Sequence, residues 1–295
     1  MIRTLTVRNR FKNYYELTKP KIWYLLVFTA FTAALTASLL FNINVAPWQW
    51  ILLLVGVAAG SAAADTITGY NDRDLDAIMD RTKNRPIPSG RISPRNALIF
   101  GLVLTGISLI CAWLINYLAF GLMAFGLFDN IIVYSKWLKR RSQTNIILGG
   151  FSGGAPALIG YVAVTMQHIE IGIAMAALVF LWIPTHIWSL ALHVKEDYTK
   201  AGVPMMPVVS SERKSVRIIA ITTLLMVLFS IVPFFTNQFG LIYLTTASVL
   251  GAAMLLLSIW LMLRPSERVS WIVFKFSSPY LAAIFIAFVV DAAFH

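Results

Sequence analysis

The chain has 295 residues, of which 58% are hydrophobic and only 13% are charged, and its mean hydropathy is +0.75. This composition lies far outside the range of soluble globular proteins and indicates a polytopic membrane protein. The net charge of +11 does not indicate nucleic-acid binding, because a DNA-binding chain presents a basic face on a soluble domain and the sequence contains none.

A helix that crosses the bilayer needs roughly 20 mainly apolar residues. Nine stretches meet this criterion, and the third and fourth are separated only by the letters INYLAF. We therefore expect an all-α protein, with residues 1–295 forming one membrane-embedded domain, because no linker or low-complexity stretch divides the chain. The expected helices cover residues 22–41, 50–70, 95–116, 118–135, 145–165, 170–192, 216–236, 240–262 and 271–290.

The positive charges predict the orientation of these helices. With nine spans, all 24 Lys and Arg residues fall on one face, and the loops of the opposite face carry none. Because loops rich in Lys and Arg stay in the cytoplasm, we expect a cytoplasmic N-terminus in the cell membrane and a C-terminus on the opposite face. The basic N-terminal segment, residues 1–20, contains Arg3 and Arg8 and is expected to lie beside anionic lipid.

The loop after the second span gathers unusual charge. Eight of the fourteen residues from Asp72 to Arg85 are charged. Asp72, Asp76 and Asp80 recur every four residues, so a helix would place them near one face. Carboxylates at this spacing repel each other. Neighbouring Arg and Lys residues or divalent cations such as Mg²⁺ can compensate; the alternative is a solvated loop.

Two features favour a binding site over a solvated loop. Arg81 and Arg85 follow the carboxylates at once, and guanidinium groups can hold phosphate oxygens with two hydrogen bonds. The letters RPIPSGRISP then give the loop a defined shape through Pro and Gly. Asp65, one helical face deeper in the membrane, is expected to line the same cavity, since intramembrane carboxylates are usually functional. The role of Asp129, another carboxylate within a span, stays open.

Further polar groups follow the fourth and sixth spans. Lys139 and Arg140 in YSKWLKRRSQTN are either an anchor on the cytoplasmic side or contacts to a phosphate. The small residues of GGFSGGAPALIGY, which begin the fifth span, predict close helix packing. The segment PTHIWSLALHVKEDYTKAGVPMMP brings a second acidic cluster, and two such clusters on one face indicate two metal ions holding a pyrophosphate. That second cluster contains Lys195, Glu196 and Asp197.

Several classes of protein are disfavoured. Cys111 is the only cysteine, so there is no disulfide framework and no Cys metal site. No motif of a P-loop, dinucleotide-binding domain, zinc protease or serine hydrolase stands in a suitable context. A transporter with an ion site at the bilayer midplane would bury its carboxylates deeper than most of the acidic residues here.

The sequence resembles a known family. The pattern D-x-x-x-D at 72–76, followed by RTKNRPIPSG, is similar to the first signature of the UbiA superfamily of intramembrane prenyltransferases. Within it, DLDAIMDRTKNRPIP, WLKRRSQTNIILGGFSGGAPALIGYVAVT and FLWIPTHIWSLALHVKEDYTKAGVPMMPVV resemble the branch that farnesylates protohaem IX, and the similarity runs from about residue 15 to 290. One position departs from the family pattern: Thr68 stands where an Asn is usual, which weakens the expected coordination of the first metal ion.

The resemblance implies helices around a central cavity that cytoplasmic loops cap. It implies transfer of a farnesyl group from farnesyl diphosphate to the 2-vinyl group of haem b, with Mg²⁺ as cofactor and haem O as product. Haem A synthase or the assembly of a haem–copper oxidase would then be partners. It assigns Mg²⁺ and diphosphate binding to Asp72 and Asp76, a second acidic site to Asp197 with Glu196, and phosphate contacts to Arg81, Arg85, Lys139 and Arg140. From the residues themselves we add Asp197 as a metal ligand and Arg81 as a catalytic residue. We also expect substrate contacts from Thr68, His186, Trp188 and Lys195.

Other readings stay open at this point. The same chemistry on a quinone-precursor ring or a glycerolipid is disfavoured by Pro204 and Pro207, which stand where those enzymes usually have an Asp-rich run. His186 is either a haem contact or a hydrogen-bonded histidine near the membrane surface beside Trp188. A transporter, or a haem-binding protein without catalysis, would not need paired acidic and arginine sites.

Overall fold

The computed structural model describes residues 7–294, so Arg3 and the side chain of Arg8 lie outside the described part of the chain. Within that part, nine helical spans are long and apolar enough to cross a membrane, which confirms the predicted all-α architecture. The spans are α2 (Pro20–Leu40), α3 (Pro47–Asn71), α5 (Pro94–Ile115), α6 with the π-helical segment η1 (Tyr117–Phe128, Asp129–Leu138), α7 with α8 (Asn145–Leu148, Phe151–Val162), α9 (Ile169–His193), α12 with the 3₁₀ segment η2 (Glu212–Ile231, Val232–Thr236), α13 (Leu241–Leu263) and α14 (Glu267–Ala293). The shorter helices are α1 (Val7–Leu17), α4 (Arg73–Ile78), α10 (Lys195–Lys200) and α11 (Met206–Val209).

Local sequence explains where several spans begin. Proline occupies the first turn of α2, α3 and α5, where its missing N–H would have no partner in any case. Ser93 and Asn116 cap α5 and α6 by accepting a backbone N–H three residues on. Asn116 stands between α5 and α6 and caps α6, so the third and fourth spans are separate helices although few residues divide them in the sequence.

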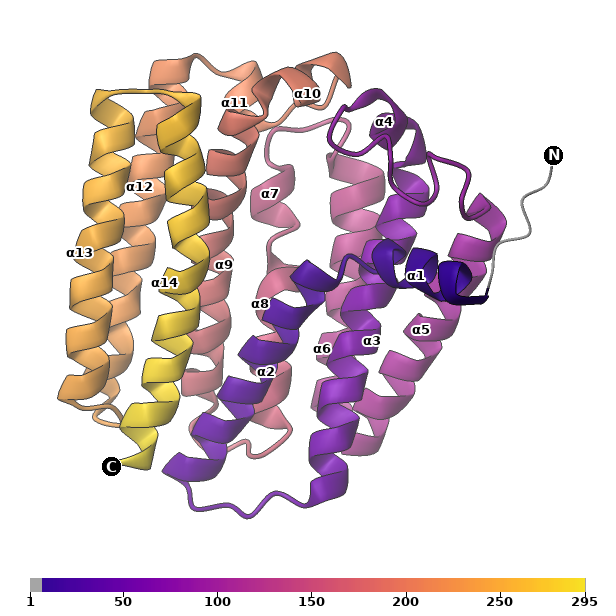
Figure 1. Ribbon diagram of the computed structural model, residues 1–295. Coiled ribbons are helices and arrows are strands. Elements are labelled where there is room, and N and C mark those ends of the chain that lie inside the picture. The colour runs from indigo at the N-terminus through magenta and orange to yellow at the C-terminus, as the bar shows by residue number, and fades with distance from the viewer. Residues whose placement is uncertain (1–6, 295) are drawn as a thin grey trace.

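The spans form a bundle with two sides. In Figure 1, α9, α12, α13 and α14 lie on the left and α3, α5 and α6 on the right, with α2 and α8 between them. A Cβ added at Gly160 of α8 would lie 2.0 Å from the carbonyl oxygen of Ala30, so α2 and α8 touch backbone to backbone. Leu102 of α5 and Leu256 of α13 are 56% and 68% exposed. Such apolar surface faces lipid in a membrane protein.

One span is broken near its start. Gly149 and Gly150 separate α7 from α8, which leaves the N–H groups at the start of α8 without partners inside the helix. The buried carboxylate of Asp129 accepts the N–H of Ser152 at 2.9 Å. This hydrogen bond gives Asp129 a structural role, because a membrane offers no water to a free backbone group.

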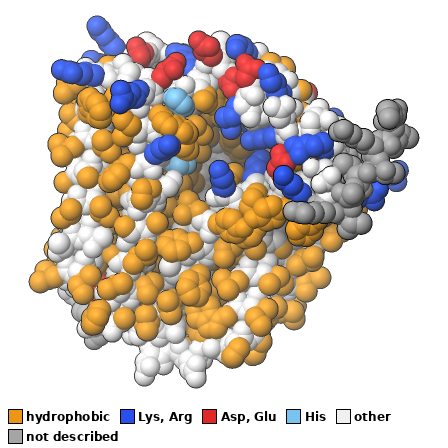
Figure 2. Space-filling view, viewed as in Figure 1, with side chains coloured by type: hydrophobic (Ala, Val, Ile, Leu, Met, Phe, Trp, Pro, Cys, Tyr) orange, Lys and Arg blue, Asp and Glu red, His pale blue; other side chains and the backbone are white. Residues whose placement is uncertain are grey.

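Charge gathers at one end of the bundle. In Figure 2 the Lys and Arg side chains lie in the upper part of the molecule, and the lower part is mainly hydrophobic. We call this the charged end; α4 and α10 lie there, and α1 runs across the bundle near it (Figure 1). The same view shows a hollow between α14 and the corner where α1 meets α2, with Lys and Arg side chains at its rim.

Candidate active site

The first acidic motif lies where α3 passes into α4. Asp72 ends α3 and precedes α4, and its carbonyl oxygen accepts the N–H of Asp76 at 2.8 Å, so the helical course continues between them. The expectation for Asp80 is wrong: α4 ends at Ile78, and Asp80 lies in the exposed turn beyond it. There it pairs with Lys83 at 2.6 Å, which lowers the pKa of Asp80 below its ordinary value.

Each of the two motif carboxylates is buried against a cation. Asp72 Oδ2 lies 2.5 Å from Lys139 Nζ, and both oxygens of Asp76 accept from Arg85 Nη1 at 2.9 Å. A third pair joins Lys19 to Asp65 at 3.1 Å. Asp65 lies on α3, about two helical turns before Asp72. Arg85 and Lys139 also lie close enough to Asp65 to act on its charge. We call these six residues the inner cluster: Lys19, Asp65, Asp72, Asp76, Arg85 and Lys139.

Lys139 keeps its charge although it is largely buried. Burial opposes the ammonium form, but Tyr134 and the Asp72 carboxylate outweigh it and hold the pKa of Lys139 above its ordinary value. The Tyr134 ring lies 5.7 Å from Lys139 Nζ. Both residues sit at the end of η1, and π-helical turns are frequent at functional sites.

Thr68 lies one helical turn before Asp72 and is buried. Its hydroxyl donates to the carbonyl oxygen of Asp65 at 3.1 Å, so its oxygen lone pairs remain available. Asn71 is no substitute for the usual Asn at position 68, because its amide donates to Ser135 at 3.3 Å, away from the motif carboxylates.

The fold brings the second acidic cluster against the first. The two Asp197 oxygens accept the backbone N–H groups of Asp80 and Arg81 at 3.4 and 3.3 Å. Asp197 thereby ties α10 to the turn after α4, across more than a hundred residues of sequence. Its neighbour Tyr198 is buried and lies close enough to Lys139 to act on its charge.

The other predicted cations lie farther out. The side chains of Arg81 and Arg140 are exposed, and Arg140 holds both oxygens of Asp74 at 2.6 and 2.7 Å. The Arg140 guanidinium lowers the pKa of Asp74 to about 2. Arg140 therefore fastens the end of η1 to α4, on the side of the motif opposite the two buried carboxylates.

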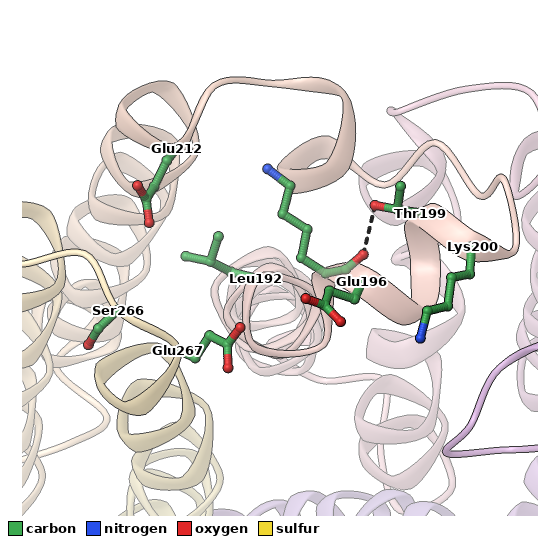
Figure 3. Close-up of a pocket in the computed structure, with 8 residues that line it drawn as sticks. Leu192, Glu196, Thr199, Lys200, Glu212, Ser266 and Glu267 are labelled. Atoms are coloured by element: carbon green, nitrogen blue, oxygen red, sulfur yellow. Dashed lines mark hydrogen bonds between the residues drawn. The ribbon is translucent and has the colours of Figure 1, made fainter.

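Lys195 and Glu196 line a separate pocket of about 540 Å³ at the charged end (Figure 3). Carboxylates of α12 and α14 close it on one side, and none of its lining residues belongs to the inner cluster. Thr199 donates to the Lys195 carbonyl oxygen at 2.9 Å and braces the helix at its rim. The lining residues are Leu192, Lys195, Glu196, Thr199, Lys200, Glu212, Ser266 and Glu267.

His186 and Trp188 lie on α9. The His186 ring stacks on Trp182, at 4.2 Å between ring centroids, and its Nδ1 lies 2.7 Å from Ser277 Oγ on α14. Trp188 is buried, and its Nε1–H has no partner among the described residues. A buried indole N–H without a partner is suited to a ligand's polar group.

Sequence reasoning missed Lys19. It entered only as one of the basic residues before the first span, yet the structure places it on Asp65. Its backbone is left-handed, with φ of 49°, at the corner between α1 and α2. The one available signal was its position immediately before Pro20, where a helix begins and the chain can change direction.

Comparisons with known proteins identify the family of the chain. The model of the UbiA prenyltransferase family matches residues 25–288. The chain belongs to the UbiA prenyltransferase family. Protoheme IX farnesyltransferase 2 of Cenarchaeum symbiosum is 50% identical, with 97% of each chain covered. Protoheme IX farnesyltransferase of Desulforudis audaxviator is 46% identical, with 96% of this chain and 89% of the relative covered.

Solved structures of UbiA proteins share the fold. A digeranylgeranylglyceryl phosphate synthase has a TM-score of 0.79 and 21% identity, covering 97% of this chain and 99% of the other. A UbiA homologue from Aeropyrum pernix has a TM-score of 0.70 and 20% identity, covering 90% and 96%. A homologue from Archaeoglobus fulgidus, solved with GPP and Mg²⁺, has a TM-score of 0.59 and 18% identity, covering 94% and 99%. The chain is thus a multi-pass membrane protein.

The donor set suits Mg²⁺ only if substrate and water complete it. Among residues 7–294, no three Asp, Glu, His or Cys side chains converge as ligands that could hold a metal ion by themselves. Asp72 Oδ1 is nevertheless buried without a partner. One or two carboxylates with water and substrate phosphates form the usual Mg²⁺ site, and the residues present fit that description.

Proposed function

We propose that this UbiA protein transfers the farnesyl group of farnesyl diphosphate to the 2-vinyl group of haem b, releasing diphosphate and forming haem O. The observation that carries this proposal is the near full-length similarity to relatives named protoheme IX farnesyltransferase. The inner cluster supplies the chemistry that such a reaction requires, because a departing diphosphate needs cations beside it.

The ion pairs of the inner cluster are the resting arrangement of a diphosphate site. Lys139 and Arg85 are held on Asp72 and Asp76, so their charges are already in place and little reorganisation is needed. When diphosphate enters, we expect the two cations to turn to its oxygens and the carboxylates to become available for Mg²⁺. When bound there, Mg²⁺ would neutralise charge on the leaving diphosphate. Arg81, Arg140, Lys195 and Glu196 stay predicted contacts at the outer rim, and Asp197 stays a predicted part of the acidic site.

The reaction forms one carbon–carbon bond. The bond between C1 of the farnesyl chain and its oxygen breaks, and both electrons leave with diphosphate. The allylic cation adds to the terminal carbon of the haem vinyl group. Water then attacks the inner vinyl carbon and loses a proton, which gives the hydroxyethylfarnesyl group. Exclusion of water from the reacting centre would protect the cation from premature attack.

Orientation and partners follow the same proposal. The charged end faces the cytoplasmic side of the cell membrane, as the placement of Lys and Arg predicts. The diphosphate group and Mg²⁺ can reach the site from the water on that side. Haem A synthase, or the assembly of a haem–copper oxidase, stays the predicted destination of the product.

A product assay tests the proposal. Purified protein in detergent receives haem b, farnesyl diphosphate and Mg²⁺, and mass spectrometry reads the pigments. We expect haem O from the unaltered protein and a loss of at least about 100-fold in Asp72→Asn and Asp76→Asn, since each variant removes a charge from the site. Asp74→Asn is the matched control, because Asp74 is exposed on the opposite side of α4 and should leave turnover intact. Farnesyl diphosphate consumed only with a phenolic or lipid acceptor would move the acceptor, and no consumption at all would refute the proposal.

A further inference from the structure

A stack of aromatic rings joins α9 to α14. His186 lies between Trp182, at 4.2 Å, and Phe274, at 4.4 Å between ring centroids. The stack continues through Trp271 to His193, with spacings of 5.0 and 4.6 Å. The ring planes of both histidines are thus held by neighbouring aromatic rings on α9 and α14.

Hydrogen bonding fixes the tautomer of His186. Ser277 has a single hydroxyl hydrogen, and it is donated to the carbonyl oxygen of Phe274 at 2.7 Å. Ser277 Oγ also lies 2.7 Å from His186 Nδ1, and both short contacts contain a hydrogen only when the serine accepts from the imidazole. A neutral imidazole that carries its proton on Nδ1 has a lone pair on Nε2. No hydrogen bond occupies Nε2 among the described residues.

Ser277 is itself held in place by α9. It is fully buried, and its carbonyl oxygen accepts the indole N–H of Trp182 at 2.7 Å. Trp182 thus stacks on His186 and also donates a hydrogen bond to Ser277, the residue that orients the His186 ring. Three contacts between the same two helices lock one ring rotation and one tautomer. A histidine that merely filled space would not need this double constraint.

We propose that Ser277 is a positioning residue that prepares His186 Nε2 as the axial ligand of the haem substrate's iron. This inference rests on the proposed function, since it takes haem as the acceptor. A metal-binding histidine usually passes its other N–H to an oriented acceptor, which sets the tautomer and raises ligand basicity. Iron held at His186 would fix the porphyrin plane, and with it the vinyl group, relative to the inner cluster.

His193 provides an internal comparison. Its Nδ1–H donates to the carbonyl oxygen of Glu267 at 3.0 Å, so its Nε2 also carries a lone pair. Seven residues of helix, about 10.5 Å along the axis, separate it from His186, and the rings of Phe274 and Trp271 stand between the two histidines in the stack. His193 lies at the end of α9, and only His186 has a side-chain acceptor that a substitution can remove.

Spectroscopy of bound haem tests the inference in the full-length protein. The probe is ferric haem b, titrated into detergent-solubilised protein while the Soret band and the reduction potential of the bound haem are recorded. His186→Phe keeps the ring stack and removes both nitrogens, so we expect the spectrum of an imidazole-bound haem to disappear. Ser277→Ala should weaken haem binding about 10- to 100-fold, the usual effect of losing a partner of a metal-bound histidine. The potential of the remaining bound haem should rise, because a less basic imidazole stabilises ferric iron less.

Matched variants separate positioning from general damage. Ser278→Ala removes the neighbouring hydroxyl and His193→Phe the other histidine of the stack, and neither should change affinity or potential. An imidazole-type spectrum that survives in His186→Phe, or an unchanged affinity and potential in Ser277→Ala, would overturn the inference. An unaltered protein without that spectrum would overturn it too. Failure of the proposed function is a different result: haem bound through His186, but no farnesylated product.

Discussion

The ion pair between Lys139 and Asp72 makes a sharp prediction about stability. The two side chains are only 16% and 6% exposed, and Asp72 Oδ1 has no other partner. Lys139→Met would leave a buried carboxylate with neither oxygen paired. Removing one partner of a buried pair typically destabilises a protein by about 3–5 kcal/mol. The folded-to-unfolded ratio should therefore fall by about two to three and a half powers of ten.

Equilibrium unfolding in detergent–SDS mixtures measures this change. The control is Arg140→Gln, which breaks an ion pair that is 39% and 60% exposed and should cost less than about 1 kcal/mol. The double variant Lys139→Met, Asp72→Asn should recover most of the loss, because no charge is left buried. If Lys139→Met cost no more than Arg140→Gln, or if the double variant recovered nothing, the argument from burial would be refuted.

Two further predictions concern the packing that shapes the site. Gly160→Ala should lower the free energy of unfolding by about 3 kcal/mol or more, because the new Cβ would lie 2.0 Å from the carbonyl oxygen of Ala30 and the backbone there can shift only a little. Gly106→Ala is the control, because a Cβ at that position would meet nothing within 4 Å. Similar free energies of unfolding for the two variants would contradict the reasoning. Asp129→Ala should lower the free energy of unfolding by about 0.5–2 kcal/mol, because the N–H of Ser152 loses its acceptor. The rate of hydrogen exchange at the Ser152 amide should rise at least tenfold. An unchanged exchange rate would contradict the structural role of Asp129.

Much of the fold was predictable because its signals are local. Hydropathy over some twenty residues defines a span, and the structure places helices on all nine expected stretches. The boundaries moved where caps or prolines act, as at Pro47 and Asn116. The broken span was not predicted, because the glycines at 149 and 150 read as packing residues. Only the position of Asp129 beside Ser152 shows how the free backbone group is satisfied.

The site was predicted in its residue types more than in its pairings. The spacing of Asp72 and Asp76 indicated a shared helical face, and the hydrogen bond from Asp76 N–H to the Asp72 carbonyl oxygen continues the helical course between them. The same reasoning failed at Asp80, because α4 ends at Ile78 and the spacing of the acidic residues does not indicate where the helix ends. The role of Lys19 was missed, since its partner Asp65 lies 46 residues away.

The sequence by itself determined the family, the spans and the face on which charge collects, because these depend on composition and short motifs. Only the tertiary structure decided which charges meet: Lys139 on Asp72, and Asp197 on the turn after α4. It also decided the tautomer of His186, through Ser277 on a helix 91 residues away in sequence. A hydrogen bond or an ion pair acts over about 3 Å, and nothing in a linear chain states which distant groups will come that close.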